Sequence, residues 1–291
     1  MDFVGKRKIW FTISLLLIIP GIIAMFMFDR PLNLGIDFTG GTVLTLEFNQ
    51  KVSTGEVRDV LAEFNRANST ILESGAKDII VKTEFLNNDE RDKIVKKLDA
   101  EIGQVRVKSE DNVGPVIGKE LAVNAITALG IASLLIVAYV TFRFEFKFAI
   151  AAIIALLHDV LVAVSLFAIF RWEVDSSFVA AILTIIGYSI NDTIVIFDRI
   201  RENMNKKRHN ESLQELINNS ITQTLTRSIN TTMTVLVTLI ALFIFGGANI
   251  RNFTLCLLIG VISGCYSTIF NASPIWYMLK QREGKKTPKA A

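Results

Sequence analysis

Long apolar stretches alternate with short polar segments along most of this chain. Six of the apolar stretches reach the length of about 20 residues that a helix needs to cross the hydrocarbon layer of a membrane. They lie near 9–28, 121–142, 148–170, 178–197, 229–248 and 253–279. The pattern therefore predicts an α-helical polytopic membrane protein with six transmembrane helices.

The segment 29–120, between the first two spans, has a different pattern. Apolar positions at helical spacing follow Ser53 and Asn87, two residues of the kind that cap helices. Strand-like runs surround these two helical patterns, at 42–48, 70–73, 78–85 and 105–108. The order β-α-β-β-α-β predicts an inserted α+β ferredoxin-like domain.

Basic residues in the short connections predict the orientation. The connections on one side of the six spans carry 16 Lys and Arg, against 2 on the other side. Because cytoplasmic loops carry the excess of Lys and Arg, we expect both termini in the cytoplasm, together with a loop at 198–228 and a basic tail at 280–291. Segment 29–120 is then extracytoplasmic. The first apolar run, within residues 1–28, is longer than a signal-peptide core, which predicts an uncleaved anchor in the cytoplasmic membrane.

Composition excludes several classes of protein. Hydrophobic residues make up 51% of the 291 residues and charged residues 20%, which argues against a soluble globular enzyme. The net charge of +3 argues against a nucleic-acid binder. Cys256 and Cys265 lie in one apolar run, so they predict neither a disulfide framework nor a metal site. We expect no cofactor, no metal and no catalytic residues.

Ionisable residues within the spans are the main candidates for function, because a charge in a membrane is costly. Asp192 lies in the fourth span, and Arg227 stands at the start of the fifth. We interpret this pair as a proton-coupling site, in which the arginine favours the ionised carboxylate. Further polar residues in the third, fourth and fifth spans predict a hydrated polar seam beside the pair: His158, Asp159, Ser189, Asn191, Asn230, Thr231 and Thr234, continued by Thr238.

Structural alternatives stand beside these assignments. Asp192 in a buried ion pair would only fix helix register, and the threonines of the fifth span would then bond to carbonyls of their own helix. His158 and Asp159 are adjacent and point about 100° apart on a helix, so only one of them is expected to face a given seam. A structural hydrogen bond explains either residue as well as proton transfer does.

Two glycine patterns complete the analysis. Residues 35–41 read GIDFTGG, and Gly35, Asp37, Phe38, Gly40 and Gly41 form either a tight turn into the first strand or a docking or gating element. Gly260 and Gly264 in the sixth span lie on a stripe of small residues, which predicts close helix packing. Pro274 and Trp276 then predict a kink and an anchor at the membrane interface.

Four stretches of the chain resemble the SecD/SecF family of bacterial protein-export membrane subunits, in its SecF branch. They are GIDFTGG at 35–41, the run 178–203 around GYSINDT, TLTRSINTT at 224–232 and LIGVISGCYSTIF at 258–270. The resemblance covers essentially the whole chain and implies a relationship to proton-driven transporters of the resistance-nodulation-division type. The family's proton-path carboxylate falls on Asp192 and its partner arginine on Arg227.

The same resemblance implies the partners. They are SecD, the SecYEG channel, YajC, the motor SecA, the lipid bilayer and an unfolded polypeptide that is crossing the membrane. It implies that inward proton flow drives late-stage export and that SecD supplies the rest of the proton path. Two other classes remain open: half of a small-molecule or lipid exporter, and a passive scaffold of the translocase. The scaffold would need no intramembrane carboxylate, and the exporter would need a substrate pocket.

Overall fold

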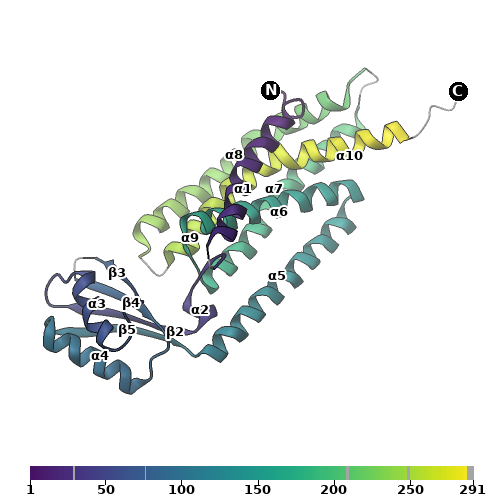
Figure 1. The fold of residues 1–291 in the computed structure, drawn as a ribbon. Helices are drawn as coiled ribbons and strands as arrows, with labels where there is room; N and C mark the ends of the chain where they lie inside the picture. The colour runs from purple at the N-terminus through teal and green to yellow at the C-terminus, as the bar shows by residue number, and fades with distance from the viewer. Residues whose placement is uncertain (29, 76, 208–209, 248–249, 287–291) are drawn as a thin grey trace. The chain divides into compact units, whose positions relative to one another are not determined.

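The fold in Figure 1 is taken from a computed structural model, which describes residues 1–28, 30–75, 77–207, 210–247 and 250–286. The chain divides into two compact units. The helical unit comprises Met1–Asn33 and Ala128–Ala291, and the α+β unit comprises Leu34–Thr127. The sequence places the inserted domain at 29–120, and the last residues of the predicted tail, 287–291, lie outside the described residues.

The structure confirms the predicted fold class. Among the described residues, six helices are long and apolar enough to cross a membrane. They are α1 (Arg7–Met27), α5 (Pro115–Arg143), α6 (Phe146–Phe170), α7 (Ser176–Asn205), α8 (Leu213–Phe245) and a last span built from α9 (Arg251–Ser267), the π-helical turn η2 (Thr268–Ala272) and α10 (Ser273–Lys286). Two short strands, β1 (Asn33–Leu34) and β6 (Glu173–Val174), lie in connections. Helices α7 and α8 extend far into the loop expected at 198–228.

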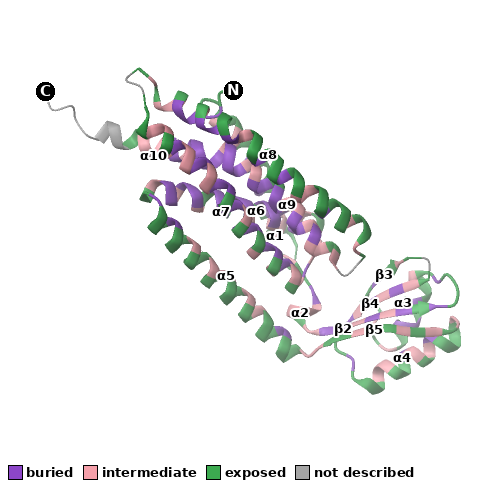
Figure 2. Ribbon diagram, turned by 180° about the vertical axis from the view of Figure 1, so that it is seen from behind, coloured by how far each residue is buried: buried purple, intermediate pink, exposed green. Residues whose placement is uncertain are grey.

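Helices α6, α7 and α9 form the interior of the helical unit. Helix α9 packs against α6, α7 and α8, and α1 packs against α6. Figure 2 shows buried residues concentrated on α6, α7 and α9, whereas one side of α8 is exposed along its length. The most apolar stretch of α5 contains no buried residue. The buried polar groups of α6, α7 and α9 therefore lie inside the helical unit.

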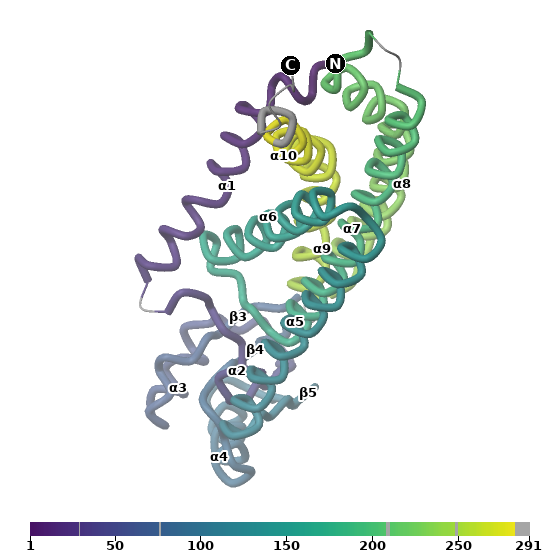
Figure 3. Tube along the Cα trace, turned by 90° about the vertical axis from the view of Figure 1, so that its right-hand side faces the viewer, coloured from purple at the N-terminus to yellow at the C-terminus, as the bar shows by residue number. Residues whose placement is uncertain are grey.

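The N-terminal residues fold back onto the first turns of α8, as Figure 3 shows. The Asn218 side chain accepts from the backbone N–H groups of Phe3 and Val4 at 3.0 and 3.1 Å. It also donates to Asp2 at 2.9 Å. Phe3 is buried against Phe270, with ring centroids 5.8 Å apart. Hydrogen bonds from the Gly5 backbone and from Asn218 lower the pKa of Asp2 below its ordinary value, so this contact persists at neutral pH.

The last span is interrupted next to Pro274, where the sequence predicts a kink. The π-helical turn η2 comes just before Pro274 and leads into α10. Trp276 follows the break and is 0% exposed. Its ring stacks on Phe148 of α6, with centroids 4.4 Å apart. The expected interface anchor is therefore wrong, because this indole lies inside the helical unit.

The α+β unit confirms the ferredoxin-like prediction. Four strands and two helices alternate in the predicted order: β2 (Gly41–Phe48), α3 (Thr54–Glu63), β3 (Thr70–Ser74), β4 (Asp78–Thr83), α4 (Asn88–Glu101) and β5 (Val105–Val113). The sheet order is β3-β4-β2-β5, and every neighbouring pair is antiparallel. This is the order of a split βαβ fold. Both α3 and α4 begin with capping boxes, at Ser53 and Asn87.

The glycine motif at 35–41 forms a tight turn before β2. The short helix α2 (Ile36–Thr39) ends at Gly40, whose φ is +74°, and Gly41 has a φ of +147°. A Cβ on Gly41 would lie 2.6 Å from the Thr83 carbonyl oxygen, and a Cβ on Gly118 of α5 would lie 2.8 Å from the Gly40 nitrogen. Glycine is thus required at Gly40 and Gly41 by conformation and by close backbone approach.

Candidate functional site

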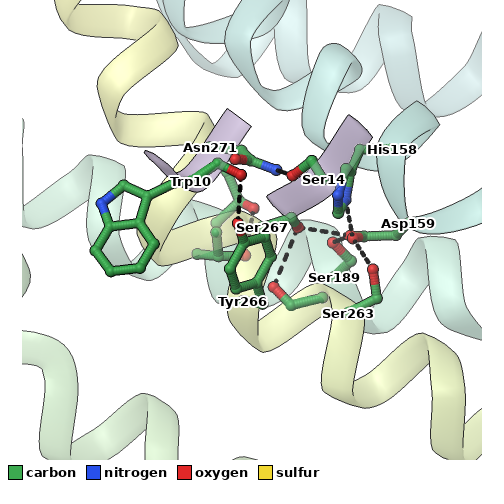
Figure 4. Close-up of polar contacts among 12 residues, drawn as sticks. Trp10, Ser14, His158, Asp159, Ser189, Ser263, Tyr266, Ser267 and Asn271 are labelled. Atoms are coloured by element: carbon green, nitrogen blue, oxygen red, sulfur yellow. Dashed lines mark hydrogen bonds and ion pairs between the residues drawn. The ribbon is translucent and has the colours of Figure 1, made fainter. Parts of the chain in front are cut away.

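A buried carboxylate, Asp159, lies where α6, α7 and α9 meet (Figure 4). Asp159 is 0% exposed. Ser189 and Ser267 donate to Oδ2 at 2.6 and 2.8 Å, and Ser263 donates to Oδ1 at 2.7 Å. The Nδ1 atom of His158 lies 3.0 Å from Oδ1. These five residues are called the Asp159 cluster below.

Small residues on α9 bring the hydroxyl groups of the cluster within reach of Asp159. Ser263 and Ser267 are one turn apart, so both face α6. Gly264 lies between them, and a Cβ there would be 3.2 Å from the Ser189 Cβ. Gly260 lies against Ile185, where a Cβ would approach to 2.2 Å. The structure thus places both predicted packing glycines at the contact between α7 and α9.

His158 and Asp159 are both buried, although they are adjacent on α6. Both residues belong to the same cluster, because the imidazole turns back toward the neighbouring carboxylate. Its ring stacks on Tyr266, with centroids 5.9 Å apart, and its Nε2 atom is buried without a hydrogen-bond partner among the described residues. In the same region, the Tyr266 hydroxyl donates to the Trp10 carbonyl and Asn271 donates to Ser14, which joins α1 to the last span (Figure 4).

A second buried carboxylate, Asp192, lies on α7 one turn beyond Ser189. Asp192 is 8% exposed. Ser228 of α8 donates to its Oδ1 atom at 2.9 Å. Its Oδ2 atom is buried and has no hydrogen-bond partner among the described residues. The next residue, Thr193, contacts Thr268 at the start of η2, with hydroxyl oxygens 3.0 Å apart.

Asp192 and Arg227 form no salt bridge within the described residues, although the charge of Arg227 acts on Asp192 through space. Arg227 is exposed, and its side chain forms no ion pair within the described part of the chain. The hydrogen-bond donor to Asp192 is Ser228, the residue that follows Arg227. Sequence reasoning missed Ser228, because a serine beside an arginine in a polar stripe carries no separate signal.

The predicted polar seam divides into two groups. His158, Asp159 and Ser189 lie inside the Asp159 cluster. The remaining residues lie on exposed sides of α7 and α8. Asn191 belongs to α7. The exposed polar stripe on α8, called the outer face of α8 below, comprises Arg227, Asn230, Thr231, Thr234 and Thr238. Its three threonine hydroxyls donate to carbonyls of α8 itself, at 2.8–3.0 Å, as the structural alternative expected.

The two carboxylates, Asp159 and Asp192, differ in their number of hydrogen-bond partners. Each Asp159 oxygen has two polar partners, so the ionised form is satisfied by neighbouring groups. Asp192 has one donor and one oxygen without a partner in the described ranges. A buried charge is costly unless it is paired and hydrogen-bonded. Asp192 is therefore the carboxylate whose surroundings suit both the ionised and the protonated form.

Metal binding finds no support in the described ranges. They contain no group of three or more His, Cys, Asp and Glu side chains that could hold a metal ion. The site consists of carboxylates, hydroxyls and one imidazole, joined by hydrogen bonds.

Two family models match the chain. The C-terminal model of the protein export membrane proteins SecD/SecF matches residues 93–282, and the SecD/SecF GG motif matches residues 26–52. Asp159 and Asp192 lie within the first match, and the glycine turn at 35–41 lies within the second. A protein translocase subunit SecF from Sebaldella termitidis is 41% identical, over 99% of this chain and 94% of its own.

Longer relatives extend the comparison. The protein translocase subunit SecDF of Bacillus subtilis is 43% identical over 98% of this chain, which spans 39% of that protein. A crystal structure of SecDF from Thermus, described as a translocon-associated membrane protein, matches with a TM-score of 0.87 and 36% identity. It covers 97% of this chain and 39% of its own. A second SecDF structure, in a super-membrane-facing form, matches with a TM-score of 0.73 and 34% identity over 98% of this chain and 39% of its own.

Proposed function

Because the chain belongs to the SecD/SecF family of protein-export membrane proteins, we propose that it is an auxiliary subunit of the Sec translocase that couples inward proton flow to late-stage polypeptide export. It is a multi-pass membrane protein. The proposal gives it no bond chemistry of its own. Its work is a conformational cycle, for which one proton moving through 100 mV supplies about 2.3 kcal/mol.

The observation that carries the proposal is the incomplete hydrogen bonding of Asp192. A carboxylate inside a membrane span is a functional candidate by default. This one has a buried oxygen without a partner in the described residues. Protonation of Asp192 removes its charge. The hydrogen bond from Ser228 then weakens, because hydrogen bonds to charged groups are stronger than those to neutral groups. A change in the contact between α7 and α8 is the conformational step that follows.

The outer face of α8 supports a partner that supplies the remaining polar groups. An exposed arginine and a row of polar residues on a membrane helix are costly against lipid. In the SecDF relative, one chain contains this region and a longer additional part. We assign that additional part to SecD, and we propose that SecD covers the outer face of α8. SecYEG, SecA and YajC complete the proposed assembly.

The distribution of Lys and Arg supports the orientation of the proposal. Both termini lie in the cytoplasm, and the α+β unit lies outside the cytoplasmic membrane, where an emerging polypeptide is available to it. The two units share one helix, α5, in the sequence. Helix α5 and the segment after α1 are therefore the two covalent routes by which a change in the spans reaches the α+β unit.

The test of the proposal is complementation of export. Cells depleted of their own SecF protein receive this chain together with the SecD of the same source, and secretion of a reporter is followed by pulse-chase. We expect restored export and co-purification of the chain with SecD. Normal membrane abundance with no restored export would contradict the proposal. Restoration by a version in which the buried carboxylates are all amides would favour the scaffold.

The outer face of α8 gives a separate prediction. Arg227→Met is expected to reduce export about tenfold, because charged hydrogen bonds contribute roughly 1.5–3 kcal/mol. Thr238→Val on the same face is expected to have little effect, because the Thr238 hydroxyl bonds to its own helix. Export is measured at matched membrane levels. Equal and small effects of the two substitutions would reject a role for this face.

A further inference from the structure

We propose that Asp159 is a positioning residue for Asp192: it ties α6 to the two elements that hold Asp192 in place. The inference rests on the proposed function of Asp192 and assigns Asp159 no proton transfer of its own. Two lines of contact lead from the Asp159 cluster to the surroundings of Asp192, one along α7 and the other through α9.

The first line runs along α7. Ser189 donates to Asp159 Oδ2 at 2.6 Å, the shortest of the serine contacts in the cluster. Asp192 is three residues further on, about 4.5 Å along the helix axis and on nearly the same face. Because a helix turns as a rigid element over one turn, the Ser189 contact fixes the rotation and height of α7 at Asp192.

The second line runs through α9 into η2. Ser267 donates to Asp159 Oδ2, and Thr268, the next residue, contacts Thr193 beside Asp192. Both threonine side chains are nearly unexposed, at 1% for Thr193 and 0% for Thr268. The π-helical turn begins at Thr268, and π-helical turns inside α-helices occur often at functional sites. Asp159 thus holds the last α-helical residue before the turn that positions Thr193.

The carboxylate of Asp159 explains why one residue can bind both Ser189 of α7 and Ser267 of α9. A carboxylate accepts several hydrogen bonds at once, whereas an amide in its place offers one acceptor oxygen and two donors. Asp159→Asn therefore keeps the size of the side chain but forces at least one serine to reverse or leave. The three helices then lose their common acceptor, and α7 and η2 can shift independently.

The experiment measures how accessible Asp192 is to an apolar carbodiimide. This reagent modifies protonated carboxyl groups in apolar sites. Membranes containing the full chain with its SecD are treated with dicyclohexylcarbodiimide, and mass spectrometry separates peptides carrying Asp159 from those carrying Asp192. In wild type we expect modification at Asp192 and none at Asp159, which is 0% exposed and has hydrogen-bond partners on both oxygens.

Three variants and one matched control test the positioning role. Asp159→Asn, Ser189→Ala and Ser267→Ala are each expected to raise the rate of Asp192 modification at least about threefold, because each removes hydrogen bonds to a charged group. Combining Asp159→Asn with Ser189→Ala is expected to add nothing, because both act through one contact. Thr254→Val removes an equally buried hydroxyl that bonds to its own helix, and it is expected to match wild type.

The outcomes separate this inference from the proposed function. A residue that only stabilises the fold would lower the thermal midpoint and leave the modification rate of folded protein unchanged, and that result would overturn the inference. If the Asp159→Asn variant does not accumulate in the membrane, the rates of Asp192 modification in Ser189→Ala and Ser267→Ala test the inference instead. Normal export by Asp192→Asn would instead reject the proposed function, whatever the modification rates.

Discussion

Asp192→Asn is expected to slow the export of a secreted reporter by about tenfold or more while leaving the chain in its complex. Asparagine has the size of aspartate and can still accept from Ser228, so the packing of α7 against α8 is preserved. It cannot take up and release a proton. Losing the drive of one proton removes up to about 2.3 kcal/mol at 100 mV, and about 1.4 kcal/mol already corresponds to a factor of ten. Pulse-chase secretion at equal membrane abundance measures the effect.

Asp198→Asn is the matched control for Asp192→Asn. Asp198 lies on the same helix, and its side chain is 44% exposed and 3.5 Å from Arg143. A surface ion pair of this kind contributes little, at most about 1 kcal/mol, so we expect nearly normal export. Equal export by Asp192→Asn and wild type would show that the buried carboxylate only packs, and the scaffold would then be the better description.

Gly21→Ala is expected to cause a large loss of stability in the helical unit. A Cβ on Gly21 of α1 would lie 2.1 Å from the Ser165 Cβ and 2.4 Å from its Cα. Because one of these atoms is backbone, α1 and α6 must separate to make room. Overpacking of this kind costs about 1–3 kcal/mol. Thermal unfolding of the purified protein in detergent, followed by gel filtration, should show a clearly lower midpoint.

Gly130→Ala serves as the control for Gly21→Ala. Gly130 lies within α5, and a Cβ added there would enter open space, with no atom of a neighbouring described element within 4 Å. Alanine favours a helix over glycine by up to about 1 kcal/mol, so the midpoint should stay the same or rise. Equal midpoints for the two alanine variants would contradict the close contact between α1 and α6.

Local patterns were sufficient for the fold. Runs of about 20 apolar residues identified the six spans, and alternation together with two capping residues identified the order of the α+β unit. These features depend only on residues that are near each other in the sequence, so a single sequence is enough to predict them. The ends of α7 and α8 were placed less well, because helices continue past the apolar run wherever polar residues still favour a helix, as at Arg199–Asn205 and Leu213–Ile221.

Contacts between helices were harder to predict. The spacing of Ser263 and Ser267 placed them on one face of a helix, but it could not show that Asp159 lies opposite. Similarly, the stripe from Arg227 to Thr238 was recognised as polar, whereas the residue that reaches Asp192 is Ser228, just beside it. The sequence shows which residues share a face. The rotation of each helix about its axis depends on packing against neighbours that are distant in the sequence.

The most direct test of the account measures export into inverted membrane vesicles supplied with ATP, with and without a proton gradient. Vesicles contain the wild-type chain, Asp192→Asn or neither, each with the SecD partner at matched levels. The account predicts that the gradient accelerates export most with the wild-type chain, and that Asp192→Asn shows only the acceleration seen in vesicles lacking the chain. Equal acceleration with Asp192→Asn and the wild-type chain would contradict proton coupling through this carboxylate.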